Sequence, residues 1–372
     1  MRWAVLFAAV TGLATAPSAS AELYPCIGET EAGKVAQHPG PLLRYGITPR
    51  VQAGQVGPVA ASAVPEDTDA THAALERLRP TTGPFVVRLN RFFWADGQRG
   101  IREMQKLTER YTSRGYLVEY QLRYHPDQEQ EGDIAAWTDF VRKVVRTFGP
   151  NPRAVALQVT NEVNFQHSPD SSDGAYTGAR DALIQGVIAA KEEARKWGYD
   201  QLEIGFNWFY RTDPVNETSF WTYLRDHGGA RLLSSLDWIG LDAYPGTFFP
   251  PVEPTLEDYR DGMVNGMSAL RCYAAVAGIS ASVPMHVEEN GWPTPPGRDY
   301  ETQAAVLRTM AQAVHDFRGT YNVADYRWFN LRDADSDDPA LAQHYGLMES
   351  DYTEKPAFAV YESMVDALSV GQ

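Results

Sequence analysis

Residues 154–162 read Ala-Val-Ala-Leu-Gln-Val-Thr-Asn-Glu, a short apolar run that closes on polar residues. Gly149-Pro150 precede it, and this pair ends the amphipathic pattern of the preceding segment. A run of this length and character is typical of a buried β-strand. Its last residue, Glu162, would then stand at the carboxyl end of the strand.

The same kind of run recurs along the chain, so the strand at 154–159 has seven counterparts. The expected strands are Leu43–Ile47, Phe85–Leu89, Tyr116–Leu122, Ala154–Val159, Leu202–Phe206, Trp238–Leu241, Met285–Val287 and Tyr326–Phe329. Helical patterns lie between and after them. The expected helices are Thr71–Leu78, Ile101–Arg114, Asp133–Phe148, Ala179–Trp197, Glu217–Asp226, Leu256–Ala277, Thr302–Phe317 and Ala357–Leu368.

Strict alternation of strands and helices predicts parallel strands joined by crossover helices. Eight such units fit a closed (β/α)8 barrel, which leaves no sheet edge open, as a single domain. An open doubly wound sheet is the alternative. It is disfavoured because no glycine-rich nucleotide-binding loop follows the first strand.

The N-terminus has the features of an export signal. Arg2 precedes an apolar stretch from Trp3 to Ala16 that is too short to span a bilayer, and Ala19-Ser20-Ala21 fits a cleavage site. We therefore expect a signal peptide at 1–21, a mature domain at 22–372 and a secreted protein. The alternative for the apolar stretch is a buried first strand.

Composition narrows the possible partners. The formal net charge of −15 disfavours nucleic acid and anionic membranes and favours an uncharged or cationic substrate. The cysteines are Cys26 and Cys272, which in an exported protein either form a disulfide or remain as two buried thiols. No Cys/His spacing indicates a metal site, so we expect no metal. We also expect no organic cofactor and a monomeric protein.

A second strand also ends in acidic residues. Residues 284–293 read Pro-Met-His-Val-Glu-Glu-Asn-Gly-Trp-Pro, which places Glu289 at the end of the seventh strand. Active residues of such barrels lie at the carboxyl ends of strands, and strands four and seven face each other across the mouth. Glu162 and Glu289 could thus meet at the roughly 5–5.5 Å separation that retaining glycosidases use.

Glu288 competes with Glu289 for this position. Because side chains alternate along a strand, only one of the two is expected to point into the barrel. Met285, Val287 and Glu289 would share one face, and His286 and Glu288 the other. Periodicity alone does not choose between the two faces.

These residues resemble a known superfamily. Thr160-Asn161-Glu162 at a fourth strand, with Glu289-Asn290-Gly291-Trp292-Pro293 at a seventh, is similar to the clan-A retaining glycoside hydrolases, which include cellulases, mannanases and plant β-glucanases. The resemblance favours Glu289 over Glu288. It implies double displacement with Glu289 as nucleophile and Glu162 as general acid and base. The implied substrate is a neutral β-linked glucan, mannan or xylan.

The resemblance also suggests partners for the two acids. Arg88 would lie near the nucleophile, and Tyr244 would donate a hydrogen bond to it. Asn161 would bind the sugar 2-hydroxyl, and His125 would help to order the site.

Further side chains at strand ends could bind sugar. Trp328 resembles the tryptophan that floors the sugar site in the superfamily. Trp208 and Trp292 follow or end strands and could stack on sugar rings, although large aromatic residues also fill cores. Asn207, beside Trp208, could bind a hydroxyl group.

Two other functions remain open. One is a carbohydrate-binding barrel without catalysis. The other is a barrel enzyme acting on a phosphorylated metabolite, which predicts a glycine-rich loop after strands seven and eight. The sequence 292–296, Trp-Pro-Thr-Pro-Pro, is a poor candidate for such a loop.

Overall fold

The computed structural model describes residues 23–27, 34–53, 62–166, 168–249 and 254–370. The expected signal peptide at 1–21 lies outside these residues. The regular elements alternate along the chain. They are β1 (Arg44–Thr48), α1 (Thr68–Leu78), β2 (Phe85–Phe93), α2 (Gly97–Thr112), β3 (Leu117–Arg123), α3 (Ile134–Phe148), β4 (Ala154–Val159), α4 (Ala179–Trp197), β5 (Glu203–Phe209), α5 (Pro214–Ser235), β6 (Trp238–Ala243), α6 (Leu256–Val276), β7 (Met285–Asn290), α7 (Tyr300–Asp316), α8 (Arg318–Tyr321), β8 (Val323–Phe329) and α9 (Pro356–Leu368), with short 3-10 turns η1 (Trp94–Asp96) and η2 (Leu341–Gln343).

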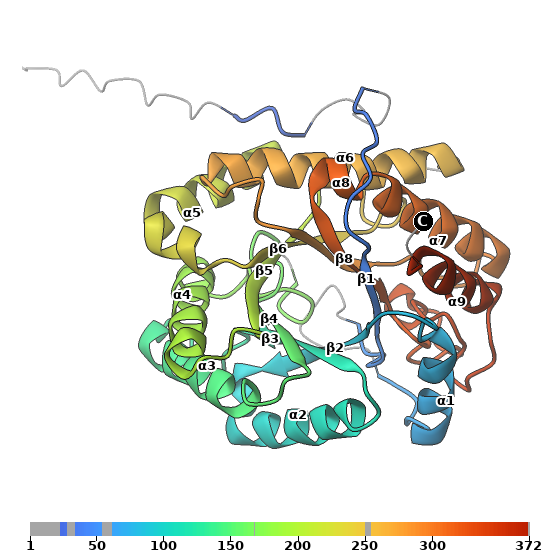
Figure 1. Cartoon of the computed structure of the whole chain (residues 1–372), viewed down its shortest axis with the longest axis horizontal. Helices are drawn as coiled ribbons and strands as arrows, with labels where there is room; N and C mark the ends of the chain where they lie inside the picture. Colours follow the sequence, from blue (N-terminus) through green and yellow to red (C-terminus); the bar gives the residue numbers. More distant parts are fainter. Residues whose placement is uncertain (1–22, 28–33, 54–61, 167, 250–253, 371–372) are drawn as a thin grey trace, which may run out of the picture.

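The strands close into a barrel in chain order. Each strand pairs in parallel with its neighbours, and β8 returns to β1 through pairs such as Gly46 with Arg327. Figure 1 shows the helices surrounding the strands in the same order. The expected single-domain (β/α)8 barrel is confirmed, and the open sheet is excluded by the β1–β8 pairing.

Local sequence signals position the helices. The side chain of Asp133 caps α3 by accepting from the Ala136 N–H, and Thr255 with Asp258 forms a capping box at α6. Gly198 ends α4 in the left-handed conformation that glycine adopts most readily. Because these caps stand where the apolar patterns begin and end, the boundaries of α3, α4 and α6 follow closely from the sequence. In contrast, α5 runs from Pro214 to Ser235, well past its expected end at Asp226.

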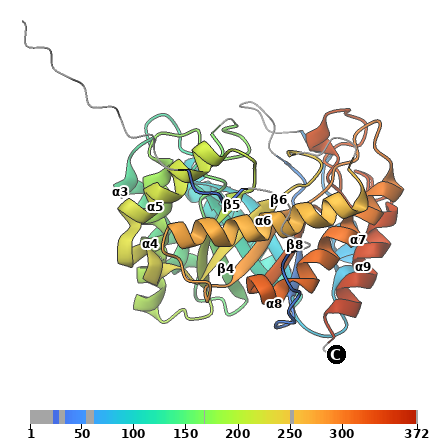
Figure 2. The same ribbon diagram turned by 90° about the horizontal axis from the view of Figure 1, so that it is seen from above.

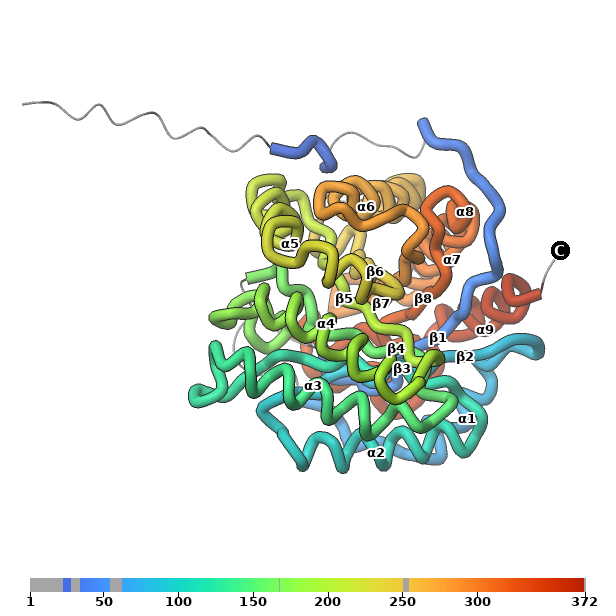
Figure 3. Tube along the Cα trace, turned by 60° about the vertical axis from the view of Figure 1, so that its left-hand side comes forward, coloured from blue at the N-terminus to red at the C-terminus, as the bar shows by residue number. Residues whose placement is uncertain are grey.

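The N-terminal segment is fastened to the outside of the barrel. Cys26 and Cys272 form a disulfide, with their Cα atoms 5.4 Å apart, so the pairing that the sequence left open is present. Cys272 belongs to α6, which lies on the outside of the barrel between α5 and α7 (Figure 2). Further along, His38 N–H donates to Thr320 of α8, and Figure 3 shows this segment passing along α8 before it enters β1.

None of the helices in the described part of the chain combines the length and apolar character needed to cross a membrane.

Candidate active site

The chain bends sharply at the end of β4. Thr160 and Glu162 both have positive φ, 66° and 47°, which is uncommon for residues other than glycine. The backbone N–H of Glu162 donates to the side-chain oxygen of Asn207 at 2.9 Å, which fixes the bend. Asn161 and Glu162 consequently both reach the cavity at the barrel mouth.

The end of β7 departs from regular alternation. Leu241 pairs with Val287 but the next residue of β6, Asp242, pairs with Glu289, so β7 holds one extra residue, a β-bulge. Glu288 contacts Arg88 inside the barrel, and Glu289 also turns inward and contacts the same arginine. The expectation that only one of the two glutamates points into the barrel was wrong, because the bulge re-aims Glu289.

Gly291 allows this strand end to approach its neighbour. A Cβ atom at this position would lie 2.4 Å from the carbonyl oxygen of Phe329. The glycine that follows Glu289-Asn290 is therefore required by the close packing of the β7 and β8 ends.

Three donors surround the carboxylate of Glu289. Arg88 donates to its Oε1 at 2.9 Å, and Gln121 donates to the same oxygen at 3.0 Å. The hydroxyl of Tyr244 donates to Oε2 at 2.7 Å. Hydrogen bonds of this kind stabilise the negative charge of a carboxylate. Burial and the charge of Glu289 raise the pKa of Tyr244 well above its ordinary value, so its hydroxyl stays a donor.

Glu162 lies opposite Glu289 and, unlike Glu289, favours its protonated form. Its pKa is raised well above the usual value, first by burial and then by the negative charge of Glu289. Glu162, Asp242 and Glu289 each offer an oxygen within 4.8 Å of the other two. The cavity thus contains one carboxyl group that holds its proton beside another that is bonded as an anion.

Asp242, which the sequence analysis did not select, completes this group. Its Oδ2 accepts from Asn207, whereas its buried Oδ1 has no donor among the described residues and its side chain is within hydrogen-bonding reach of Glu162. Burial and the charges of Glu289 and Glu162 raise its pKa. A proton shared between Asp242 and Glu162 satisfies both side chains.

The spacing of these three acids alone would suit a metal ion. Their surroundings fit a proton better, because both oxygens of Glu289 and one oxygen of Asp242 already accept from protein donors. The arrangement is therefore described by acid–base chemistry.

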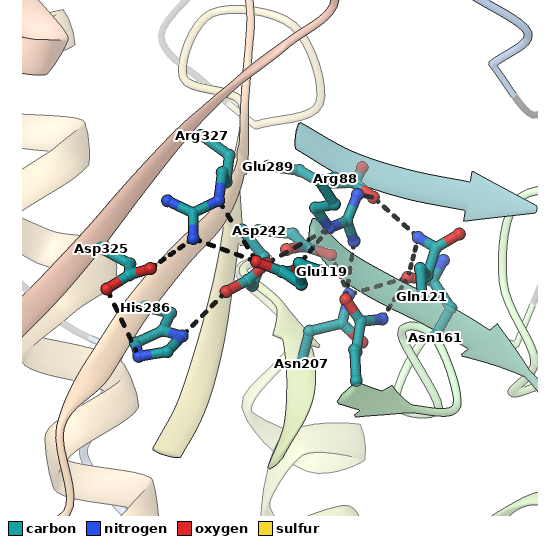
Figure 4. A network of polar contacts seen from close by, with 12 residues as sticks. Arg88, Glu119, Gln121, Asn161, Asn207, Asp242, His286, Glu289, Asp325 and Arg327 are labelled. Carbon is teal, nitrogen blue, oxygen red and sulfur yellow. Dashed lines mark hydrogen bonds and ion pairs between the residues drawn. The ribbon is translucent and has the colours of Figure 1, made fainter. Parts of the chain in front are cut away.

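A buried chain of charges lies beneath the site (Figure 4). Arg88, the member nearest the barrel mouth, contacts Glu119 and Glu288 at 3.2 Å each, and Glu119 contacts Arg327 at 3.1 Å. Arg327 pairs with Asp325. The chain ends at the amino-terminal side of the barrel, where Arg44 joins Asp325 to Glu203. Burial and the neighbouring Glu288 raise the pKa of Glu119 to about 8.

The cavity above the acids has a volume of about 510 Å³ and two contrasting sides. Polar residues come mainly from the ends of β1 to β4, and apolar residues mainly from β5, β6 and the segment after β8. The polar set is Gln52, Asn90, Arg91, Gln121, Arg123, Asn161 and Ser171; the apolar set is Ala53, Phe165, Phe209, Tyr244, Phe248, Phe329, Ala340, Leu341, Ala342 and Tyr345, with Arg211 among them.

Six of the residues predicted from sequence meet at this site. Four of them line the cavity: Asn161, Glu162, Tyr244 and Glu289. Arg88 and Asn207 lie just below and hold these side chains, rather than facing a substrate. The side-chain oxygen of Asn161 already accepts from Gln121, Gln158 and Asn207. Its amide nitrogen donates to the carbonyl oxygen of Ser171, which leaves one N–H of the amide to face a ligand.

The other four predicted residues are not among those that line the cavity. The indole N–H of Trp208 donates to Glu217 in the layer between the barrel and the helices. Trp328 is fully buried, and the indole N–H of Trp292 donates to the hydroxyl of Tyr259. His125 stacks on Phe93 outside the cavity.

Alternation explains the tryptophan placements. Trp208 and Trp328 each point outward, and the next residue in each strand, Phe209 and Phe329, turns to the cavity instead. Phe329 and Tyr345 pack edge-to-face beside Tyr244 and form the aromatic floor of the site.

Known structures with a similar arrangement provide the comparison. GH5_18 from Streptomyces cattleya, solved in complex with GlcNAc, superposes with a TM-score of 0.60 over 91% of this chain and 82% of its own, at 17% identity. At this identity the likeness shows a shared fold, the closed (β/α)8 barrel. GH5_18 from Bifidobacterium longum, in complex with Manb1-4GlcNAc, gives a TM-score of 0.56 at 13% identity, covering 80% of this chain and 72% of its own.

A β-glucuronidase from an uncultured Clostridium sp. also has a similar fold, with a TM-score of 0.54 at 13% identity and 88% of this chain covered. This chain spans about half (51%) of that longer protein. No protein-family model and no curated protein matches the sequence.

Proposed function

We propose that the protein is a retaining hydrolase of β-glycosides, with Glu289 as nucleophile and Glu162 as general acid and base. One observation carries the proposal: carboxyl oxygens of the two residues lie within 4.8 Å over one cavity. Inverting enzymes separate their carboxyl groups by roughly 6.5–9.5 Å to admit a water molecule between acid and sugar. The shorter distance favours direct attack by a carboxylate.

The reaction proceeds in two displacements. In the first, an oxygen of Glu289 bonds to the anomeric carbon while the glycosidic bond breaks, and Glu162 gives its proton to the departing oxygen. In the second, Glu162 takes a proton from water, the water oxygen bonds to the same carbon and the bond to Glu289 breaks. The product keeps the β-configuration.

The surroundings of each acid suit its role. Glu289 carries its charge among the donors Arg88, Gln121 and Tyr244. Glu162 retains its proton because it is buried and lies beside that charge, as a general acid must at neutral pH. Loss of the charge on Glu289 in the covalent intermediate would release the proton of Glu162 more easily, which prepares it to act as a base.

The proposed substrate is a neutral β-linked saccharide such as a glucan, mannan or xylan. Support comes from the uncharged side chains Gln52 and Asn90 on the polar side of the cavity, which can bond hydroxyl groups. We further propose a secreted monomer, consistent with the export-like sequence at 1–21 and with the disulfide.

Azide chemistry tests the two roles separately. After a screen of β-1,3-glucan, β-1,4-glucan, mannan and xylan identifies the sugar, its 2,4-dinitrophenyl β-glycoside is given to the variants Glu289→Ala and Glu162→Ala with sodium azide. We expect an α-glycosyl azide from the first variant and a β-glycosyl azide from the second, by NMR. Full activity of Glu289→Ala without azide, or an α-anomer as first product of the wild type, would refute the mechanism.

Binding without turnover is the competing outcome. If calorimetry detects saccharide binding while no β-linked glycan or glycoside is cleaved, the barrel is a carbohydrate-binding protein and the catalytic assignment fails.

A further inference from the structure

The position of the general acid fixes where a leaving group must lie. Glu162 delivers its proton to the oxygen of the breaking bond, so whatever is attached to that oxygen occupies the side of the cavity next to Glu162. The residues that line this side therefore determine which leaving groups the site accepts.

This side is a wall of phenylalanines, which we call the phenylalanine wall and define as Phe165, Phe209 and Phe248. Phe165 follows Glu162 by three residues, and its ring centroid lies 5.1 Å from that of Phe209. Phe209 in turn contacts Phe248 at 5.7 Å. Phe248 stands at the lip, with 47% of its surface exposed, and Phe165 is half-buried. Together the three rings form a contiguous aromatic surface along the cavity.

Arg211 lies beside the phenylalanine wall, and two of its donor groups are already bonded within the protein. The guanidinium of Arg211 lies 5.7 Å from the centre of the Phe165 ring. Its Nε donates to Glu217 at 2.9 Å and its Nη2 to the carbonyl oxygen of Asn164 at 2.7 Å. Arg211 therefore supports the ring of Phe165, and the wall presents aromatic faces to the cavity.

The opposite side of the cavity has the reverse character. The buried side-chain oxygen Oδ1 of Asn90 has no donor among the described residues, and Gln52 and Arg91 line the same side. The hydroxyl groups of a sugar can form hydrogen bonds with such a polar surface. An apolar group gains free energy against the phenylalanine wall because apolar area is removed from water.

We propose that the leaving-group side of the cavity takes an apolar aglycone, so that the preferred substrates are β-glycosides of alkyl or aryl alcohols. This inference rests on the proposed function and narrows its substrate: the neutral sugar remains the glycone, and an apolar alcohol replaces the second sugar of a glucan, mannan or xylan as the leaving group. The sugar occupies the polar side, the glycosidic oxygen meets Glu162, and the aglycone lies along the phenylalanine wall.

A matched pair of substrates isolates the effect. Methyl and octyl β-glycosides of the accepted sugar have alcohol leaving groups of similar basicity, so the ratio of their kcat/KM values reports contacts of the chain. We expect the octyl glycoside, below its critical micelle concentration, to be favoured roughly tenfold or more, as burial of two methylene groups predicts. A disaccharide with the same glycone should be cleaved less efficiently than the octyl glycoside.

Two variants test whether the wall is responsible. Phe248→Ala removes the exposed ring and should reduce the octyl-to-methyl ratio of kcat/KM values to about a third or less. Trp197→Ala removes a comparably exposed aromatic ring, 52% exposed, at the far end of α4 and should leave the ratio unchanged.

The possible outcomes are separable. Equal cleavage of methyl and octyl glycosides, or a preference for the disaccharide, would overturn this inference while leaving the proposed function intact. An octyl preference that survives Phe248→Ala and Phe165→Ala together would also overturn it. No cleavage of any β-glycoside would overturn the proposed function and this inference with it.

Discussion

Removal of the Tyr244 hydroxyl provides a sharp test of the site. In Tyr244→Phe the ring keeps its edge contacts with Phe248, Phe329 and Tyr345, so the packing is preserved. The variant loses the 2.7 Å hydrogen bond to Glu289. A hydrogen bond to a charged group contributes about 1.5–3 kcal/mol, which corresponds to a rate change of about 10- to 150-fold.

The loss should fall mainly on the second displacement. There Glu289 departs as a carboxylate, and the hydroxyl stabilises the charge as it forms. In the first displacement the same bond makes Glu289 a weaker nucleophile, so its removal has partly compensating effects. We therefore expect the covalent intermediate to accumulate in Tyr244→Phe.

Stopped-flow measurement with a 2,4-dinitrophenyl β-glycoside checks this expectation. The variant should release a burst of dinitrophenol close to one equivalent and then turn over slowly, with kcat reduced and KM reduced with it. Tyr210→Phe deletes the same hydroxyl from a buried tyrosine outside the cavity and should behave as the wild type. A Tyr244→Phe variant with unchanged kcat, or with both steps slowed equally, would refute the reasoning.

Three further predictions concern protons and the disulfide. Because Asp242 is held neutral beside Glu162, Asp242→Asn should keep kcat/KM within about tenfold, whereas Asp242→Ala should lose about 100-fold or more, by steady-state kinetics. The native state holds the proton of Glu119 up to pH about 8, whereas the unfolded chain releases it near pH 4.5, so wild-type stability should fall as pH rises through this window. In urea unfolding, the free energy of unfolding should fall less between pH 5 and pH 8 for Glu119→Gln than for the wild type. An equal fall in both would mean that another group holds the proton. The disulfide spans 246 residues, for which chain entropy gives a stabilisation of at most about 5 kcal/mol, and Cys26→Ser should lower Tm by several degrees in calorimetry; no shift would mean that the N-terminal segment contributes nothing to the barrel.

The fold was predictable because each barrel strand leaves a local trace. Segments such as 154–159 and 238–243 are buried on both faces and read as short apolar runs, and the helices between them carry caps such as Asp133 and Thr255. Closure followed from the number of units. The export signal stays a prediction, since residues 1–22 lie outside the described structure.

The site was predictable only in part. The bulge in β7 depends on its register with β6, which a single strand does not encode, so both glutamates face inward against the expected alternation. Asp242 was missed although a clue existed, because an acidic residue inside an apolar strand must have a buried partner. Trp328 was selected for its resemblance to the tryptophan that floors the sugar site in the superfamily, whereas its neighbour Phe329 has the orientation that lines the cavity.

The chain of charges under the site has a wider consequence. Alternating acidic and basic side chains connect Glu203 and Arg44, at the solvent-accessible base of the barrel, to Arg88 and Glu289 at its mouth. The surroundings of the reactive carboxylate therefore extend beyond Arg88, because Arg88 also contacts Glu119 and Glu288, and Glu119 contacts Arg327. Substitutions at the base of the barrel are therefore expected to affect the site at its opposite end. Transfer of the mouth residues to another barrel that lacks this chain of charges would not reproduce the environment of the nucleophile.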